Sequence, residues 1–300
     1  MITVVGFSPA VDVTYTLEKL VPGTSQRVST KTSKAGGKAV NVASVLTTLG
    51  VANKVLLPLG GSSGEFIAED LAQRQISLTK LSITNPTRTC IAIVAKEATV
   101  LNEPASSLTE SEYSEFEELV KKEVMDSKIV IFSGSIPANY SQDRFGKLIQ
   151  TVKNNSKTIL VDCSGDWLVT AASSGADFLK PNESELAELF PNLSESQALE
   201  KLLEFGATSV YLSLGEGGGR YKNDKEDILV QVPKLSGNAT GAGDAFVAGF
   251  ASSLDQDLTL EEKLILASAC AGAAVTNDTA GEVDLDVVKS LKTQVKVVSK

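Results

Sequence analysis

Residues 238–246 read Asn-Ala-Thr-Gly-Ala-Gly-Asp-Ala-Phe and lead into an apolar stretch with helical spacing. Gly241 and Gly243 let the backbone approach an anion closely, and the free N–H groups of a helix start can hold a phosphate or a developing charge. The helix dipole favours a negative charge on Asp244, so we expect its carboxylate to be ionised. A carboxylate beside a phosphate cradle is what phosphoryl transfer to a hydroxyl requires. The spacing leaves a second interpretation open, an ordinary glycine-rich turn before a helix-start aspartate.

The composition is typical of a globular protein. Hydrophobic residues make up 42% of the 300 residues and charged residues 22%, which excludes disorder and collagen-like repeats. A chain of this length forms one large domain or two modest ones and needs no metal or disulfide to stabilise its core. The most apolar stretch, residues 264–275, is too short to span a bilayer, and the N-terminus lacks the basic region of a signal peptide. We therefore expect a cytoplasmic protein that does not bind membranes.

The chain contains no histidine. This excludes Ser-His-Asp triads, histidine general bases and histidine-ligated metals, so proton transfer must use a carboxylate, lysine, tyrosine or cysteine. The three cysteines, Cys90, Cys163 and Cys270, lie far apart in the sequence, which argues against a disulfide framework or a zinc site. We expect all three to be buried and to act as small hydrophobic residues.

The formal net charge is −9, and the Lys and Arg residues form no basic stripe along the chain. Nucleic acid binding needs clustered Lys and Arg side chains to contact the phosphate backbone, so the sequence predicts no nucleic acid partner. A phosphorylated ligand would have to be held by a few local cations.

Short apolar runs alternate with stretches of helical spacing. The runs that predict strands are 2–6, 54–59, 128–132, 158–161, 177–179 and 208–213, and the predicted helices are 38–50, 109–124, 141–152, 182–189, 194–205, 242–254 and 260–276. This alternation predicts a parallel sheet covered by helices on both faces. Residues 11–32 and 88–101 are rich in β-branched residues with no helix between partners, which predicts antiparallel strands outside the main sheet.

Three further segments follow predicted strands or open helices. Residues 35–41 (Ala-Gly-Gly-Lys-Ala-Val-Asn) form a glycine loop that enters a helix, but it is not a P-loop because Ala39 follows the lysine. Residues 180–185 (Lys-Pro-Asn-Glu-Ser-Glu) fit a capping box at a helix start, which explains them without any ligand. Residues 213–219 fit either a tight hairpin turn or a nucleotide contact. Each segment is a weak indication when taken alone.

Taken together and in order, these segments resemble the ribokinase/PfkB family of carbohydrate kinases. The motifs that carry the resemblance are AGGKAVN (35–41), SGSIP (133–137), DCSG (162–165), KPNESE (180–185), SLGEGG (213–218) and ATGAGDAF (239–246). The resemblance spans nearly the whole chain and is most similar to the branch that holds 1-phosphofructokinase and tagatose-6-phosphate kinase. It implies one domain over residues 1–300. This domain would be a ribokinase-like three-layer α/β/α core with a mostly parallel sheet, and a small β-sheet lid would be formed by about 11–32 and 88–101.

The resemblance also implies a role for each matching residue. Asp244 would be the catalytic base, and the backbone N–H groups of Gly241, Ala242 and Gly243 would form an anion hole. Lys38 and Arg88, with Arg27 and Ser135, would face the phosphate of the sugar, and its other contacts would be Asp12, Gly36, Gly37 and Asn41. The residues implied for ATP are Lys180, Asn182, Ser213, Gly215, Gly218, Thr240 and Asn277. Glu185 would serve Mg²⁺ through water.

The activity implied is phosphate transfer from ATP, with Mg²⁺, to a ketohexose phosphate. Residues 102–104 (Asn-Glu-Pro) are more similar to enzymes that act on fructose 1-phosphate, whereas residues 88–94 and 161–165 are similar to tagatose-6-phosphate kinases. Ser8 stands where the family usually has Asn, and Ala39 stands where it usually has Gly. The lid strands would offer a homodimer contact. Two alternatives stay open: a kinase of an unphosphorylated sugar or nucleoside, and a non-catalytic regulator that binds a sugar phosphate.

Overall fold

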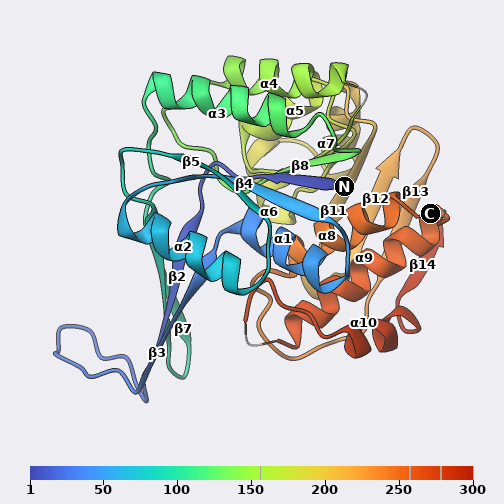
Figure 1. Ribbon diagram of the computed structural model, residues 1–300. Helices are drawn as coiled ribbons and strands as arrows, with labels where there is room; N and C mark the ends of the chain where they lie inside the picture. Colours follow the sequence, from blue (N-terminus) through green and yellow to red (C-terminus); the bar gives the residue numbers. More distant parts are fainter. Residues whose placement is uncertain (156, 257, 278, 300) are drawn as a thin grey trace.

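The computed structural model describes residues 1–155, 157–256, 258–277 and 279–299, and within them a ten-stranded sheet forms the centre (Figure 1). The strand order is β14-β13-β12-β11-β10-β9-β8-β1-β4-β5. The parallel strands are β1 (Ile2–Val5), β4 (Asn53–Leu59), β5 (Leu78–Ser82), β8 (Ile129–Ser133), β9 (Thr158–Asp162), β10 (Phe178–Leu179) and β11 (Ser209–Ser213). The antiparallel strands β12 (Gly219–Asn223), β13 (Asp227–Gln231) and β14 (Lys296–Ser299) complete one edge.

Helices cover both faces of this sheet (Figure 1). One layer holds α3 (Glu110–Glu123), α4 (Gln142–Asn154), α5 (Asp166–Ser173), α6 (Glu183–Leu189) and α7 (Glu195–Glu204), and the other holds α1 (Lys38–Thr48), α2 (Gly61–Gln73), α8 (Ala242–Leu254), α9 (Leu260–Val275) and α10 (Leu285–Lys292). Neighbouring strand residues such as Val4 and Val5 belong to different hydrophobic clusters, because successive side chains point to opposite faces. The predicted α/β architecture is therefore confirmed.

Small residues bring α8 and α9 close together. A Cβ atom added to Gly249 would lie 2.9 Å from Cα of Ala267 and 3.0 Å from Sγ of Cys270. Small residues in these two helices therefore allow the helices to pack closely. Cys163 is buried like Cys270, but Cys90 on the lid is only half-buried, so the expectation of three buried cysteines is wrong at that position. No helix in the described part of the chain is long and apolar enough to span a bilayer.

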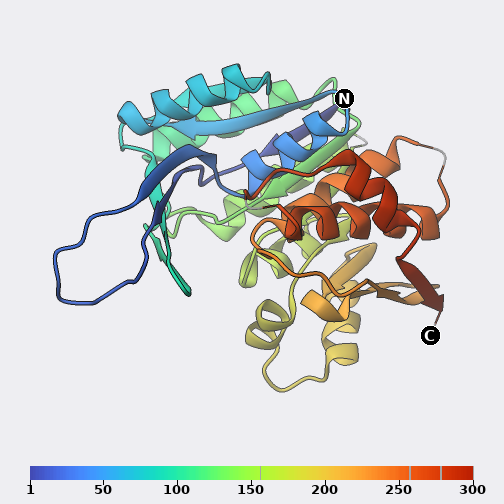
Figure 2. The same ribbon diagram turned by 90° about the horizontal axis from the view of Figure 1, so that it is seen from below.

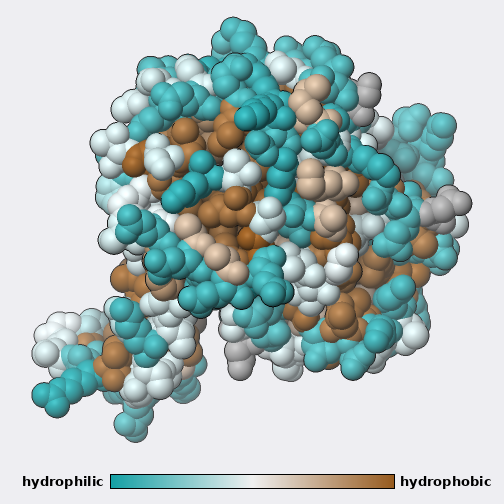
Figure 3. Space-filling view, viewed as in Figure 1, coloured by the Kyte–Doolittle hydropathy of each residue, from teal (hydrophilic) through white to brown (hydrophobic). Residues whose placement is uncertain are grey.

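A four-stranded sheet, here called the lid, projects from the main body (Figures 1 and 3). Its strands are β2 (Ala10–Thr16), β3 (Thr30–Gly36), β6 (Arg88–Val94) and β7 (Ala98–Asn102), in the order β3-β2-β6-β7. The pairs β2–β3 and β6–β7 are antiparallel as predicted, but β2 and β6 pair in parallel. The reason is that β2 follows β1 and β6 follows β5, and both core strands run in the same direction. The loop between β2 and β3 extends farther out (Figure 2).

Candidate active site

Several polar residues stand where the parallel strands of the large sheet end. Ser133 ends β8, Asp162 ends β9 and Ser213 ends β11, while Lys180 directly follows β10. Carboxyl ends of parallel strands meet at the same edge, which is where α/β proteins place their ligands. The starts of α1 and α8 are brought to the residues at this edge by the contacts described below.

Asp244, the predicted base, lies buried in the first turn of α8. Its Oδ2 accepts a hydrogen bond of 2.8 Å from Nδ2 of Asn41 on α1. Burial raises the pKa of Asp244 to about 6, and the charge of Asp162 adds to this, whereas Lys38, the bond from Asn41 and Lys180 act in the opposite direction. The carboxylate is still ionised at neutral pH, but it is more basic than its position at a helix start indicates. A base needs a pKa near the working pH, so this environment suits proton abstraction.

Asp162 is a functional candidate that the sequence reasoning did not assign. It has no exposed surface, and its Oδ1 lies 3.1 Å from Nζ of Lys38 and 3.3 Å from Nζ of Lys180. Burial opposes its ionised form, but the two ammonium groups lower its pKa below the usual range. Its Oδ2 has no hydrogen-bond partner among the residues that the structure describes. A carboxylate at the end of a buried strand was the available sequence signal.

Lys38 and Lys180 lie beside the predicted transfer site. Nζ of Lys38 is also 4.0 Å from Oε1 of Glu185, and the carboxylates around it raise its pKa although burial opposes its charge. Nζ of Lys180 would lie 3.0 Å from a Cβ atom on Gly243, so this ammonium group lies against the start of α8. Two cations therefore stand near the base. The role implied for Lys38 at the phosphate of the sugar stays a prediction.

Asn182 and Glu185 form the capping box that the sequence predicts at the start of α6. Oδ1 of Asn182 accepts from the backbone N–H of Glu185 at 2.8 Å, and Oε2 of Glu185 accepts from the backbone N–H of Asn182 at 2.9 Å. The cap fixes the carboxylate of Glu185 so that its other oxygen faces Lys38. The predicted capping box is thus confirmed, and Oε1 of Glu185 takes no part in it.

The glycine turn before α8 has the geometry of an anion site, with one difference from the expectation. Gly241 is left-handed, with φ of 84°, which favours glycine at this position. The N–H of Ala242 donates to the carbonyl of Ala239 at 3.1 Å, so this donor is already used within the turn. The predicted anion hole then depends on the N–H groups of Gly241 and Gly243.

The predicted sugar contacts gather where the lid joins the core. A Cβ atom on Gly36 would lie 1.9 Å from Oδ2 of Asp12, so only glycine leaves room for this carboxylate. Burial raises the pKa of Asp12, although the charges of Lys34 and Arg88 oppose the shift. Arg88 Nη1 donates to the carbonyl of Glu103 at 2.9 Å. Gly37 precedes α1 with φ of 93°, and Asn41 lies one turn farther along that helix.

A cavity of about 400 Å³ lies next to the glycine turn, and residues of α8, α9 and β11 line it. The predicted nucleotide residues that line it are Asn182, Ser213, Gly215 and Gly218, together with Ala242 and Gly243 of the glycine turn. Its remaining walls include Val232, Pro233, Leu235, Tyr211, Phe246, Ser268, Ala271 and Gly272. Residues 213–219 fit both interpretations, because they turn β11 into β12 and also line the cavity.

Three predicted residues lie apart from these groups, and a fourth, Thr240, lies in the glycine turn but not in the lining of the cavity. Arg27 is exposed in the loop between β2 and β3, and Ser135 is exposed after β8. Thr240 is exposed in the glycine turn, and Asn277 follows α9. Neither Thr240 nor Asn277 is among the described residues that line the cavity. Their roles stay predictions that this conformation does not support by contact.

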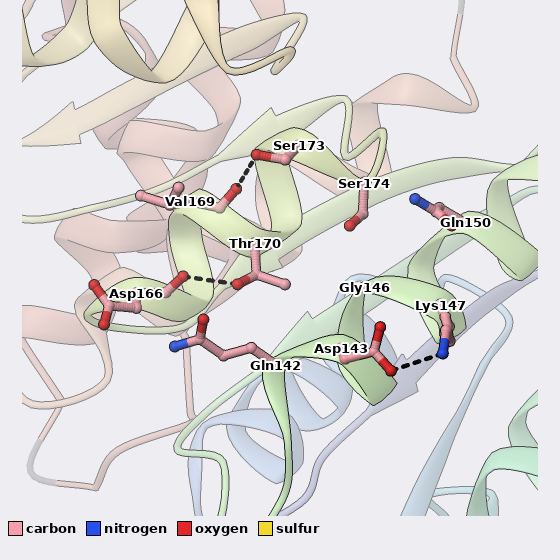
Figure 4. Close-up of a pocket in the computed structure, with 10 residues that line it drawn as sticks. All are labelled: Gln142, Asp143, Gly146, Lys147, Gln150, Asp166, Val169, Thr170, Ser173 and Ser174. Carbon is pink, nitrogen blue, oxygen red and sulfur yellow. Dashed lines mark hydrogen bonds and ion pairs between the residues drawn. The ribbon is translucent and has the colours of Figure 1, made fainter.

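A second pocket, of about 530 Å³, lies between α4 and α5 (Figure 4). Most of the residues that line it have polar side chains, and Figure 4 shows that Asp143 pairs with Lys147 and that Thr170 and Ser173 bond within their own helix. None of the predicted site residues lines it. It is a surface groove between helices rather than part of the site.

The fold and the site define a class of protein: a three-layer α/β enzyme with a buried carboxylate beside a glycine turn and a cavity. Residues 1–286 match the model of the pfkB family of carbohydrate kinases, so the chain belongs to this family. It is 29% identical over 303 residues to 1-phosphofructokinase of Bacillus subtilis (strain 168), covering 99% of each protein.

Solved structures give the same result. Phosphofructokinase-2 from Escherichia coli in complex with potassium matches with a TM-score of 0.91 and 25% identity, covering 97% of this chain and 98% of that one. The structure described as a possible 1-phosphofructokinase from Thermotoga maritima matches with a TM-score of 0.88 and 21% identity over 100% of both chains, and it supports the fold alone. The family resemblance predicted from the motifs is therefore confirmed.

Proposed function

We propose that this carbohydrate kinase transfers the terminal phosphoryl group of ATP to a ketohexose phosphate. The observation that carries the proposal is the position of Asp244. Its buried carboxylate, with a pKa raised to about 6, lies at the glycine turn, and the same turn lines the cavity. The similarity to a 1-phosphofructokinase over 99% of both chains supports a sugar that already carries a phosphate.

Each residue of the site would have its own role in the transfer. Asp244 takes the proton of the acceptor hydroxyl, whose oxygen forms a bond to the terminal phosphorus while the bond to the ADP oxygen breaks. The N–H groups of Gly241 and Gly243 meet the negative charge on the transferred group, as donors at a helix start do. Lys180 and Lys38 add positive charge on the same side, because phosphoryl transfer depends mainly on positioning and electrostatic stabilisation.

Two carboxylate oxygens of the site that accept no hydrogen bond from the described residues suit Mg²⁺. Oε1 of Glu185 lies outside the cap, and Oδ2 of Asp162 is buried without a partner in the described residues. Mg²⁺ binds through one or two carboxylates, waters and substrate phosphates, so Glu185 and Asp162 are the side chains that would hold it. When bound, it neutralises charge on the phosphates of the nucleotide.

Fructose 1-phosphate is the acceptor that we favour over tagatose 6-phosphate. The curated 1-phosphofructokinase is similar over the whole chain, and residues 102–104 agree with that enzyme class. Arg88 would bind the phosphate of the sugar, since its planar guanidinium suits phosphate oxygens. The lid offers the homodimer contact, because Val100 and Leu101 on β7 are more than half exposed.

The test is a panel of acceptors with ATP and Mg²⁺. Purified enzyme would be assayed on fructose 1-phosphate, tagatose 6-phosphate, fructose 6-phosphate, free fructose and a nucleoside. We expect the highest kcat/KM with fructose 1-phosphate. A preference for a free sugar or a nucleoside would refute the proposal in favour of the first alternative, and binding without turnover would favour a regulatory protein.

A further inference from the structure

The loop after α9 lies against the transfer site. A Cβ atom on Gly241 would lie 3.0 Å from Cβ of Ala280, and one on Gly281 would lie 2.7 Å from Oδ1 of Asn41. Asn41 is the side chain that donates to the predicted base. Residues 280–281 therefore contact both the glycine turn that forms the anion hole and the asparagine that holds the base.

Lys34 reaches this loop from the lid. Its Nζ donates a hydrogen bond to the backbone carbonyl of Ala280, which joins residues 246 positions apart in the sequence. The strands β2 and β3 pair so that Lys34 lies opposite Asp12, the carboxylate predicted to bind the sugar. Burial lowers the pKa of Lys34, while the charges of Asp12, Glu282 and Asp70 favour its ionised form. A partly buried ammonium group thus connects the lid with the loop.

We propose that Lys34 is a positioning residue that couples the sugar side of the lid to the anion hole through the carbonyl of Ala280. The inference rests on the proposed function, in which the glycine turn binds the transferred phosphoryl group. The loop packs closely on Gly241, where a Cβ atom would lie 3.0–3.2 Å from atoms of Ala280 and Gly281, so a shift of the loop would move the turn or loosen it. A misplacement of about 1 Å at reacting atoms costs up to about 100-fold in rate.

The effect should fall on kcat. Lys34 holds the loop that supports the site, so its loss should affect the transition state more than substrate binding. Lys34→Met removes the charge and the donor but keeps most of the stem. We expect kcat to fall about 10- to 100-fold and KM for the sugar phosphate to change less than about threefold. The assay is run at pH 8, well above the ordinary pKa of an Asp carboxyl, to limit protonation of Asp12, whose pKa burial raises and whose nearby charge on Lys34 is lost in the variant.

Two further variants sharpen the test. Lys31→Met is the matched control, because Lys31 lies on the same strand but is exposed, and it should leave kcat unchanged. Lys34→Arg should restore most of the lost kcat, since its guanidinium again offers N–H donors to the carbonyl. If Lys34→Met did not fold, Lys34→Ala, which also lacks a donor, would replace it with the same expected fall in kcat.

Amide hydrogen exchange of residues 279–283 gives a readout independent of turnover. Exchange should be faster in Lys34→Met than in the wild type or Lys31→Met. A raised KM with unchanged kcat would overturn the proposal, because Lys34 would then be a substrate-binding cation. Unchanged kcat, or unchanged exchange in the loop, would also overturn it. If the wild type showed no kinase activity, the proposed function would fail, and the exchange comparison alone would decide whether Lys34 restrains the loop.

Discussion

Asp244→Asn separates catalysis from stability at the centre of the site. The change removes one buried charge, keeps the size of the side chain and keeps an oxygen that can accept the bond from Asn41. Burial raises the pKa of Asp244 from the ordinary 3.8 to about 6. The folded protein therefore binds this proton more tightly than the unfolded chain. As a result, the wild type loses free energy of unfolding as the pH rises from about 4 to about 6.

The size of this loss follows from the shift. At about 1.4 kcal/mol per pH unit, a change from 3.8 to about 6 corresponds to about 3 kcal/mol. We expect Asp244→Asn to be more stable than the wild type by up to about 3 kcal/mol at pH 7–8 and to lose this gain near pH 4. Its kcat should fall by about 10²–10⁴, the range for a positioned base. From the sequence alone, Asp244→Asn is expected to leave the free energy of unfolding almost unchanged, because Asn has the same size and keeps hydrogen bonding. The structure changes this expectation because it shows that the carboxyl is buried.

The measurement is urea unfolding at pH values from 4 to 8, together with turnover at pH 8. The matched control is Asp143→Asn, since Asp143 also lies in the first turn of a helix but is exposed. The control should keep its kcat, and its stability should change by less than about 1 kcal/mol through the lost pair with Lys147.

Two results would refute this reasoning. If Asp244→Asn were less stable than the wild type at every pH, the ionised carboxylate would be held by favourable contacts rather than destabilised by burial. If it kept near-normal turnover, Asp244 would be a helix-start residue only, and the proposed transfer would need another base.

The remaining predictions concern pH, the phosphate of the acceptor and the metal. The value of kcat/KM should fall with decreasing pH below about 6, because protonated Asp244 cannot accept a proton; a flat profile down to pH 5 would contradict this. Arg88→Ala should raise KM for the sugar phosphate by about 10- to 100-fold and leave KM for ATP within about threefold, through the loss of charge-assisted bonds. An unchanged KM for the sugar phosphate would remove Arg88 from the phosphate site. Excess chelator should abolish turnover and added Mg²⁺ should restore it, whereas full activity in chelator would show that no divalent metal takes part.

The centre of the large sheet could be predicted because buried parallel strands are short apolar runs. The runs at 2–6, 128–132 and 158–161 match β1, β8 and β9 to within one or two residues. The antiparallel strands β12, β13 and β14 and the edge strand β5 are not predicted, because they contain polar and charged residues alongside apolar ones. Helix α2 was missed because it opens with Gly-Ser-Ser-Gly, a sequence typical of a loop.

The candidate site could be predicted where its chemistry is local. The glycine turn with Asp244 and the cap formed by Asn182 and Glu185 depend on residues that are neighbours in the chain. Asp162 and Lys34 could not be assigned in this way. Asp162 meets Lys38 across 124 positions of sequence, and Lys34 meets the loop after α9 from the lid. No periodicity or motif records such pairings, since they exist only after the chain has folded.

The tight packing of α8 on α9 has a consequence for ligand choice. One side of α9 fits against Gly249 with no room for a methyl group, while Ser268, Ala271 and Gly272 of the same helix form a wall of the cavity. The width of the cavity therefore depends on how closely α8 and α9 can approach each other, and this distance is limited at a residue outside the lining of the cavity. Enlarging Gly249 would move that wall and change which ligands the cavity can hold, although Gly249 is not among the described residues that line the cavity. New selectivity in this family can thus arise from residues that no map of ligand contacts would include.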